Sequence, residues 1–447
     1  MIRIVTILFL SVVVPLRAAT TITLLHFSDY HSHAQPFYSE GSLKGGVARA
    51  IGFLERHKRD GALVFNGGDM MNKGAPAWSD KYHCAEWAWF NGVVDAMAFG
   101  NHDADYGNDE LTRCRSTVRY PILSANTTGF ERYRVFERKG VRIGVFAIAG
   151  ADFPTLVTNA KLTFTDPLAA ARDVVQTLRE SEHVDAVVMI GHEQAVDDQK
   201  LAAAVPGIDL IFGSHTHLKR ELTLIPGTHT WFISPFQYGT YVSLVEMTFD
   251  RRKLTGVRGQ LVPIDASVAP DRKVALKVAS MQRALESDPN FRDLFATIAT
   301  LPEPIEVDAL ARFTVDTMRE ITHADVALST ASSFRQALPS GTIDLETLRV
   351  AMPYDNEIVV AQLTGDQLQT VLSRADTADP ASDARSFSTA APPIDRAKTY
   401  AVAVTDYMAK VSPSFRDVFR DAKLISTGFH VRAEVLKHLM MLPAAKP

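Results

Sequence analysis

The sequence lacks three features that define common protein classes. It has two cysteines in 447 residues, which excludes a cysteine-rich zinc or disulfide scaffold. Its formal net charge is -4, without the basic excess of a nucleic-acid-binding protein. Its long apolar run, from Ile4 to Leu16, is too short to span a bilayer. We therefore expect neither a nucleic-acid polymer as a partner nor stable insertion into a membrane.

The first nineteen residues are typical of a secretory signal peptide. Arg3 precedes the apolar run, and the small residues Ala18 and Ala19 follow it. A second strand-like run begins at Thr21, so the first domain is expected to start at about residue 20. The alternatives are an uncleaved anchor and a buried first strand. We expect a secreted or periplasmic protein.

The two cysteines, Cys84 and Cys114, have two interpretations. Export would permit a disulfide between them. Such a bridge would close a loop of about 30 residues and contribute about 3 to 4 kcal/mol in the chain-entropy model. Two separate buried thiols fit the sequence equally well.

The sequence does contain a repeated arrangement in which an apolar, strand-like run ends in metal-binding side chains. The ends are Asp29-Tyr30-His31, Gly68-Asp69, Gly100-Asn101-His102, Gly191-His192 and Gly213-Ser214-His215-Thr216-His217. Apolar runs separated by amphipathic stretches predict strands that are buried on both faces. Sites in such α/β folds form beyond the carboxyl ends of the strands, so these ends are expected to converge.

The side chains delivered there are two Asp, one Asn and four His: Asp29, His31, Asp69, Asn101, His192, His215 and His217. Mixed imidazole and carboxylate ligands suit zinc, manganese, iron or cobalt better than calcium or magnesium. The set is too large for one tetrahedral ion, but it fits two ions that share a carboxylate. We therefore predict two divalent metal ions as cofactors.

In order and spacing, these motifs resemble those of the calcineurin-like metallophosphoesterases. More narrowly, they resemble the 5'-nucleotidase family, which includes UDP-sugar hydrolases. The resemblance implies a four-layer αββα sandwich of α/β class, followed by a smaller α+β domain. It divides the predicted ligands into Asp29, His31 and His217 for one metal, Asn101, His192 and His215 for the other, and Asp69 as the bridge.

The resemblance also implies that His102 is a catalytic residue outside the ligand set, and that Asp105 orients it. The chemistry agrees. Two cations lower the pKa of a shared water toward about 7 and neutralise phosphate oxygens. A cationic His102 beside the phosphoryl group would stabilise the transition state or protonate the leaving oxygen. Asp105, three residues on, can hold the other ring nitrogen.

The chain divides into four predicted parts: a signal peptide over 1–19, a metallophosphoesterase domain over 20–268, a linking helix over 269–300, and a 5'-nucleotidase-type domain over 301–447. In the last part the resemblance assigns Arg335, Tyr354 and Phe415 to substrate binding. Several glycines of the family's turns are replaced there, by Thr330 to Ser333 for example. The two aromatic residues either clamp a base or belong to the core.

The sequence thus predicts an exported dimetal hydrolase of small-molecule phosphate esters, most simply nucleotides. It leaves the oligomeric state open. A first alternative is a thiosulfohydrolase-like member of the same family. A second is a non-catalytic binding protein that keeps metals for structure, although such a protein has no need of His102 or Asp105.

Overall fold

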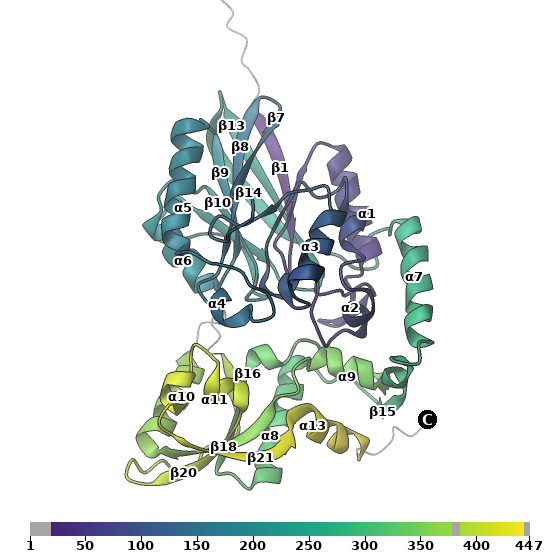
Figure 1. Cartoon of the computed structure of the whole chain (residues 1–447), viewed down its shortest axis with the longest axis vertical. Helices are drawn as coiled ribbons and strands as arrows, with labels where there is room; N and C mark the ends of the chain where they lie inside the picture. The colour runs from purple at the N-terminus through teal and green to yellow at the C-terminus, as the bar shows by residue number, and fades with distance from the viewer. Residues whose placement is uncertain (1–18, 378–384, 442–447) are drawn as a thin grey trace, which may run out of the picture.

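The structure is a computed structural model that describes residues 19–377 and 385–441. The predicted signal peptide lies outside these residues, apart from Ala19. Two six-stranded sheets form the first half of the molecule (Figure 1). The order in the first sheet is β14 (Lys253–Pro263), β13 (Tyr241–Asp250), β1 (Thr20–Phe27), β4 (Leu63–Asn66), β5 (Ala96–Ala98) and β6 (Ile122–Leu123). The order in the second is β11 (Lys219–Leu224), β12 (Trp231–Pro235), β10 (Leu210–Gly213), β9 (Ala186–His192), β8 (Val141–Ala149) and β7 (Tyr133–Arg138).

Three apolar cores show that these sheets are the inner layers of a sandwich. One core lies between the sheets and joins residues such as Leu24 and Phe65 to Val188 and Phe212. A second packs the other face of the first sheet against α1 (Val47–Arg59), and a third packs the other face of the second sheet against α5 (Pro167–Gln176) and α6 (Ala195–Ala204). The predicted four-layer αββα sandwich is confirmed.

The central strands are apolar and buried on both faces. In β9 all seven residues are buried, as are all four in β4 and in β10. Neighbouring central strands pair in parallel: β1 with β4, β4 with β5, and β9 with β10. Among the helices between them, α5 has a side-chain cap: the Asp166 carboxylate accepts a hydrogen bond from the backbone N–H of Ala169, and Pro167 occupies the first turn.

Cys84 and Cys114 form a disulfide. The bridge joins the segment after α2 (Ala77–Tyr82) to α3 (Asn108–Thr117), and so encloses the turn that carries Asn101 and His102. Of the two interpretations of these cysteines, the structure therefore supports the cross-link.

A smaller α+β unit follows. Its five-stranded sheet has the order β19 (Ser386–Ser388), β16 (Val326–Thr330), β20 (Thr399–Thr405), β18 (Glu357–Thr364) and β21 (Lys423–His430). A two-stranded sheet pairs β15 (Thr297–Leu301) with β17 (Gly341–Asp344). The helices of the unit are α8 (Val307–Thr322), α9 (Leu345–Ala351), α10 (Gly365–Thr377), α11 (Asp406–Lys410), α12 (Arg416–Phe419) and α13 (Val431–Met440).

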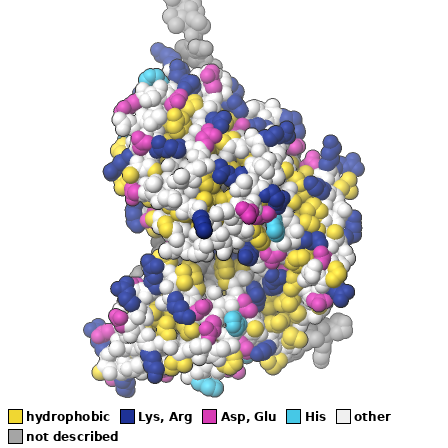
Figure 2. All heavy atoms as spheres, in the orientation of Figure 1, with side chains coloured by type: hydrophobic (Ala, Val, Ile, Leu, Met, Phe, Trp, Pro, Cys, Tyr) yellow, Lys and Arg dark blue, Asp and Glu magenta, His cyan; other side chains and the backbone are white. Residues whose placement is uncertain are grey.

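Within the expected linking segment, 269–300, a single α-helix, α7, occupies Arg272–Glu286. It runs along the side of the molecule from the sandwich toward the second unit (Figure 1). The remaining part of the segment contains a 3-10 turn, Arg292–Phe295, and most of β15. On the face drawn in Figure 2, a furrow separates the two units, and acidic and basic side chains are interspersed rather than segregated by sign.

Candidate metal centre

The strand-end motifs meet, as the parallel topology requires. Three of them follow β1, β4 and β5 of the first sheet, and two follow β9 and β10 of the second sheet. Backbone hydrogen bonds join the loops: the Asp29 N–H donates to Gly68 at 3.1 Å, and the His31 N–H donates to Asp69 at 2.9 Å. The site therefore lies where the carboxyl ends of strands from both sheets come together.

The first cluster is Asp29, His31 and His217, whose ligand atoms all lie within 4.8 Å of one another. The Nε2 atoms of His31 and His217 are 3.2 Å apart, and His217 Nε2 lies 3.5 Å from Asp29 Oδ1. All three side chains are at most 8% exposed. Burial holds the pKa of both imidazoles well below the ordinary value, so these rings are neutral and keep a lone pair for a cation.

The second cluster is Asp69, His192 and His215, whose ligand atoms also lie within 4.8 Å of one another. Asp69 Oδ2 lies 3.3 Å from His192 Nε2 and 3.6 Å from His31 Nε2, in the other cluster. One carboxylate therefore lies between the two groups. This is the position that a bridging ligand of a two-metal site requires.

Each of the four imidazoles has one ring nitrogen anchored by an oxygen from outside the predicted ligand set, as is usual for ligands in metal sites. His31 Nδ1 donates to the Met71 carbonyl at 3.2 Å, and His192 Nδ1 donates to that of Gly67 at 2.5 Å. His217 Nδ1 is held by Gln237 Oε1, while His215 is held at Nε2. Three of the rings thus leave Nε2 as the atom for a metal, and His215 leaves Nδ1.

Two buried polar atoms of the predicted ligand set have no hydrogen-bond partner: Asn101 Oδ1 and His192 Nε2. An unpaired buried acceptor costs about 1 to 3 kcal/mol, so such atoms require an explanation. A cation supplies one, because an amide oxygen and an imidazole nitrogen are both atoms that ligate divalent metals. The donor set therefore fits two divalent metal ions.

The ligand loops have strained backbones. Five predicted ligands adopt positive φ angles between 46° and 65°: Asp29, His31, Asp69, His215 and His217. Such angles are uncommon outside glycine, and clusters of them mark functional sites. The loops also approach very closely, since a Cβ at Gly100 would lie 2.2 Å from the backbone nitrogen of Asp69. Glycine is required there for the two loops to touch.

His102 and Asp105 form the predicted pair at the edge of the clusters. His102 Nδ1 donates to Asp105 Oδ2 at 2.7 Å, and the His102 ring centroid lies 5.1 Å from that of His31. The His102 backbone N–H donates to Asp69 Oδ1 at 2.8 Å. Burial lowers the pKa of His102, but the carboxylates of Asp105 and Asp69 outweigh it and hold that pKa well above the ordinary value.

Two residues that hold ligands were not found from the sequence. Asp152 Oδ2 lies 3.1 Å from His215 Nε2 and also accepts from Gln194 Nε2 at 2.9 Å. Gln237 holds His217, and its amide N–H donates to the Arg335 carbonyl at 2.8 Å. Both residues follow strands, β8 and β12 respectively, so the strand-end rule would have found them had single polar residues been counted.

The structure brings two of the three predicted substrate residues to this centre. The Arg335 guanidinium contacts the ring of His217, with Nη1 2.6 Å from Nδ1 and 3.2 Å from Nε2. Tyr354 lies beside it, with its hydroxyl 3.3 Å from Arg335 Nη2. Both residues come from the second unit, so that unit faces the metal clusters directly.

Phe415 is not at the site. Its ring is fully buried in the core of the second unit, where it belongs to the same cluster as Met408 and Phe419. As the chain is folded here, Phe415 cannot stack on a ligand. Its placement corresponds to the core alternative for the aromatic residues, and the expected aromatic pair at the site is reduced to Tyr354.

A four-layer sandwich with paired His–Asp clusters at its strand ends is the architecture of a metallophosphoesterase. Comparison with known families agrees. Residues 22–219 match the calcineurin-like phosphoesterase family, and residues 296–391 match the 5'-nucleotidase C-terminal domain. The chain therefore belongs to the calcineurin-like phosphoesterases, in the 5'-nucleotidase branch that joins these two domains. The predicted class, a phosphoric ester hydrolase of this family, is confirmed.

Individual proteins are similar along almost the whole chain. The protein UshA of Yersinia enterocolitica is 24% identical over 93% of this chain and 90% of its own length. The structure of a 5'-nucleotidase precursor from Thermus thermophilus matches with a TM-score of 0.74 and 22% identity, covering 96% of this chain and 97% of that one. The sulfate thiohydrolase SoxB of Thermus thermophilus matches with a TM-score of 0.72 and 18% identity, covering 95% of each chain. At these identities the structural matches establish the fold.

Proposed function

We propose that this chain is an exported, dimetal hydrolase of phosphate monoesters whose substrates are nucleotides or closely related compounds. One observation carries the proposal: Asp69 lies between two buried ligand clusters, and the His102–Asp105 pair stands directly beside them. The first feature holds two cations. The His102–Asp105 pair has no part in holding the cations. Its presence therefore supports catalysis over a purely structural use of metal.

In this proposal each ligand residue binds one metal, except for one residue that binds both. We assign Asp29, His31 and His217 to one metal, Asn101, His192 and His215 to the other, and Asp69 to both. When bound, two divalent ions supply Lewis-acid polarisation of a phosphate ester and activation of water. Zinc, manganese, cobalt and iron suit this donor set.

His102 is the candidate acid. Because Asp105 accepts its Nδ1 proton, the ring is fixed and Nε2 is left to donate to the oxygen of the leaving group or to a charged phosphoryl oxygen. Arg335 adds a fixed positive charge beside the first cluster, where an anionic substrate would need one.

In this proposal residues 20–268 carry the metals and residues 301–447 carry the groups that contact the rest of the substrate, with 269–300 as the link. Export is supported by the disulfide between Cys84 and Cys114, since such bridges persist in oxidising compartments. No helix within 19–377 and 385–441 is long and apolar enough to cross a membrane.

The test is a panel of phosphate esters assayed with manganese, zinc, cobalt or magnesium added to metal-free protein. We expect phosphate release from nucleoside monophosphates with at least one of the first three metals. His102→Ala should abolish most of this release while the protein still binds metal. Hydrolysis of a thiosulfonate-type substrate in place of every phosphate ester would favour the thiosulfohydrolase alternative, and no hydrolysis at all would favour a binding protein.

A further inference from the structure

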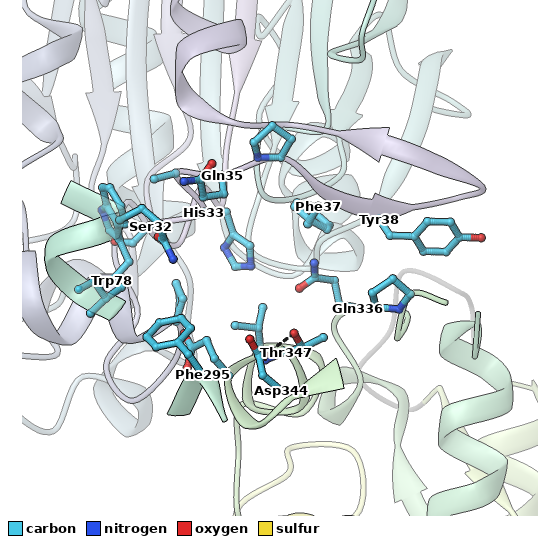
Figure 3. A pocket seen from close by; sticks show the side chains of 18 of the residues that line it. Ser32, His33, Gln35, Phe37, Tyr38, Trp78, Phe295, Gln336, Asp344 and Thr347 are labelled. Atoms are coloured by element: carbon cyan, nitrogen blue, oxygen red, sulfur yellow. Dashed lines mark hydrogen bonds between the residues drawn. The ribbon is translucent and has the colours of Figure 1, made fainter. Parts of the chain in front are cut away.

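Helix α9 of the second unit lies against the loop of the first unit that follows Asp69. Both border a cavity of about 370 Å³ between the units, with Trp78 of α2 on the first unit's side and with Asp344 and Thr347, at the start of α9, on the second unit's side (Figure 3). The Asp344 carboxylate caps α9, because it accepts hydrogen bonds from the Thr347 backbone N–H at 2.7 Å and from the Thr347 hydroxyl at 2.6 Å. The helix therefore begins at a fixed point of this interface.

Two charged side chains of α9 hold the first unit's segment 74–77 at both ends. Glu346 Oε1 accepts a hydrogen bond from the Ala77 backbone N–H at 2.5 Å, and the Arg349 guanidinium donates to the Gly74 carbonyl. Glu346 and Arg349 also pair with each other, with Oε2 and Nη1 3.2 Å apart. Because these two side chains are only 12% and 16% exposed, water competes little for their hydrogen bonds. The second unit therefore fixes one short stretch of backbone in the first.

Within the first unit, Asp80 holds the other side of Gly74. Asp80 Oδ1 accepts hydrogen bonds from the Gly74 backbone N–H at 2.9 Å and from the Tyr106 hydroxyl at 2.7 Å, and Asp80 Oδ2 lies 3.8 Å from Arg349 Nη2. Gly74 has a φ of 93°. Glycine loses more conformational freedom on folding than any other residue, so its placement depends on such outside contacts. Asp80 and Arg349 thus hold Gly74 at its N–H and at its carbonyl.

The residue before Gly74 holds the carboxylate that orients His102. The Lys73 backbone N–H donates to Asp105 Oδ2 at 3.0 Å, and the same oxygen accepts the His102 Nδ1 proton at 2.7 Å. Because Lys73 and Gly74 are consecutive, a displacement of Gly74 is carried to the Lys73 amide and from there to Asp105. The contacts thus run without a break from Arg349 in the second unit to His102 beside the metal clusters.

From these contacts we propose that Arg349 and Glu346 are positioning residues for the His102–Asp105 pair, which is fully aligned only while α9 holds the segment 74–77. The proposal rests on the role of His102 in the proposed function. It gives the second unit a part in the chemical step that is separate from contact with the leaving group. In agreement, Arg349 is not among the described residues that line the cavity.

The test is a double-mutant cycle between Arg349→Met and Asp105→Ala, measured on the metal-loaded full chain with glycerol phosphate as a small ester. Arg349→Met keeps a long side chain and removes its hydrogen bonds. We expect kcat to fall by about tenfold, or about 1.4 kcal/mol, at the lower end of what a hydrogen bond to a charged group contributes, and KM to change by less than about twofold. In the Asp105→Ala background the same substitution should lower kcat by less than about twofold, because Arg349 then has no carboxylate to act through.

Further variants separate positioning from a general weakening of the interface. Glu306→Ala removes another hydrogen bond between the units, from the Tyr38 hydroxyl to Glu306 at 2.8 Å, and should leave kcat unchanged. Glu346→Leu should lower kcat as Arg349→Met does, whereas Glu346→Gln, which keeps an acceptor oxygen, should retain most of it. Additive effects of Arg349→Met and Asp105→Ala, an unchanged kcat in Arg349→Met, or an equal loss in Glu306→Ala would overturn the proposal.

Hydrogen exchange gives a readout that does not need activity. The backbone amides of Lys73 and Gly74 both donate hydrogen bonds to carboxylates, so in Arg349→Met they should exchange at least about tenfold faster than in the parent. In Glu306→Ala their exchange should be unchanged. Absence of hydrolysis of every ester by the parent would overturn the proposed function, and faster exchange in Arg349→Met would then still support the assignment of Arg349 to this loop. Equal exchange in the parent and Arg349→Met would refute it.

Discussion

Asp152 gives the sharpest test of how this centre would hold a second metal. Its Oδ2 accepts a hydrogen bond from His215 Nε2 at 3.1 Å, and both side chains are only 10 to 12% exposed. Because Asp152 occupies Nε2, Nδ1 is the His215 atom that is left for a metal. The change Asp152→Asn keeps the size of the side chain and removes its charge. Hydrogen bonds to charged groups contribute about 1.5 to 3 kcal/mol and neutral ones about 0.5 to 1.5, so the substitution should cost about 1 to 1.5 kcal/mol.

That cost corresponds to a loss of about tenfold in affinity at the second site, at the lower end of the range of 10- to 100-fold that outer contacts of metal ligands contribute. The assay is competition between metal-free protein and a chromophoric chelator, fitted to two sites. Asp197→Asn, at a half-buried residue of α6 that pairs with Lys200, is the control and should leave both affinities unchanged. Equal weakening of both sites by Asp152→Asn, or a change smaller than twofold, would refute the assigned role.

Three further predictions follow from the same geometry. Asp69→Asn should release both ions together, and metal analysis that still finds two per chain would contradict the bridge. His102→Ala should retain both ions and lower kcat by roughly 10² to 10⁴ on a poor leaving group, measured by phosphate release. Burial raises the pKa of Glu86 to about 8, against the hydrogen bond from Tyr30, so the folded protein keeps a proton on Glu86 that the unfolded chain loses above about 4.5. The free energy of unfolding should therefore fall by up to about 1.4 kcal/mol per pH unit between pH 4.5 and 8, a dependence that denaturation of Glu86→Gln should lack.

The sequence was sufficient to predict that the proposed metal ligands meet, because each of them stands in a pattern that a chain rarely produces by chance. A strand buried on both faces must be apolar throughout, so a change to Gly and then to His, Asp or Asn marks its end sharply. His192 after β9 and His215 after β10 are such cases. The parallel order of the sheets then brings those ends to one place without further information.

Asp152 and Gln237 were missed because each is a single polar residue after a strand, and one residue is a weak signal. Asp152 follows Gly150, and a Cβ at that position would lie 2.5 Å from Asp152 Oδ1. That relation is visible only in three dimensions. The cavity between the units could not be predicted either, since its walls are separated by some 300 residues and depend on how the two units meet.

Phe415 shows why the resemblance is a weaker guide to substrate contacts than to which metal-binding side chains meet. A metal ligand is fixed by chemistry, because few side chains can replace it, whereas an aromatic ring serves a pocket or a core equally well. Met408 and Phe419 lie near Phe415 in the chain, and all three belong to one fully buried cluster. With that ring in the core and the neighbouring glycines replaced, Tyr354 alone remains beside Arg335. One ring cannot clamp a base from both faces, so the two-sided clamp that the resemblance assigns to Tyr354 and Phe415 cannot form in this fold.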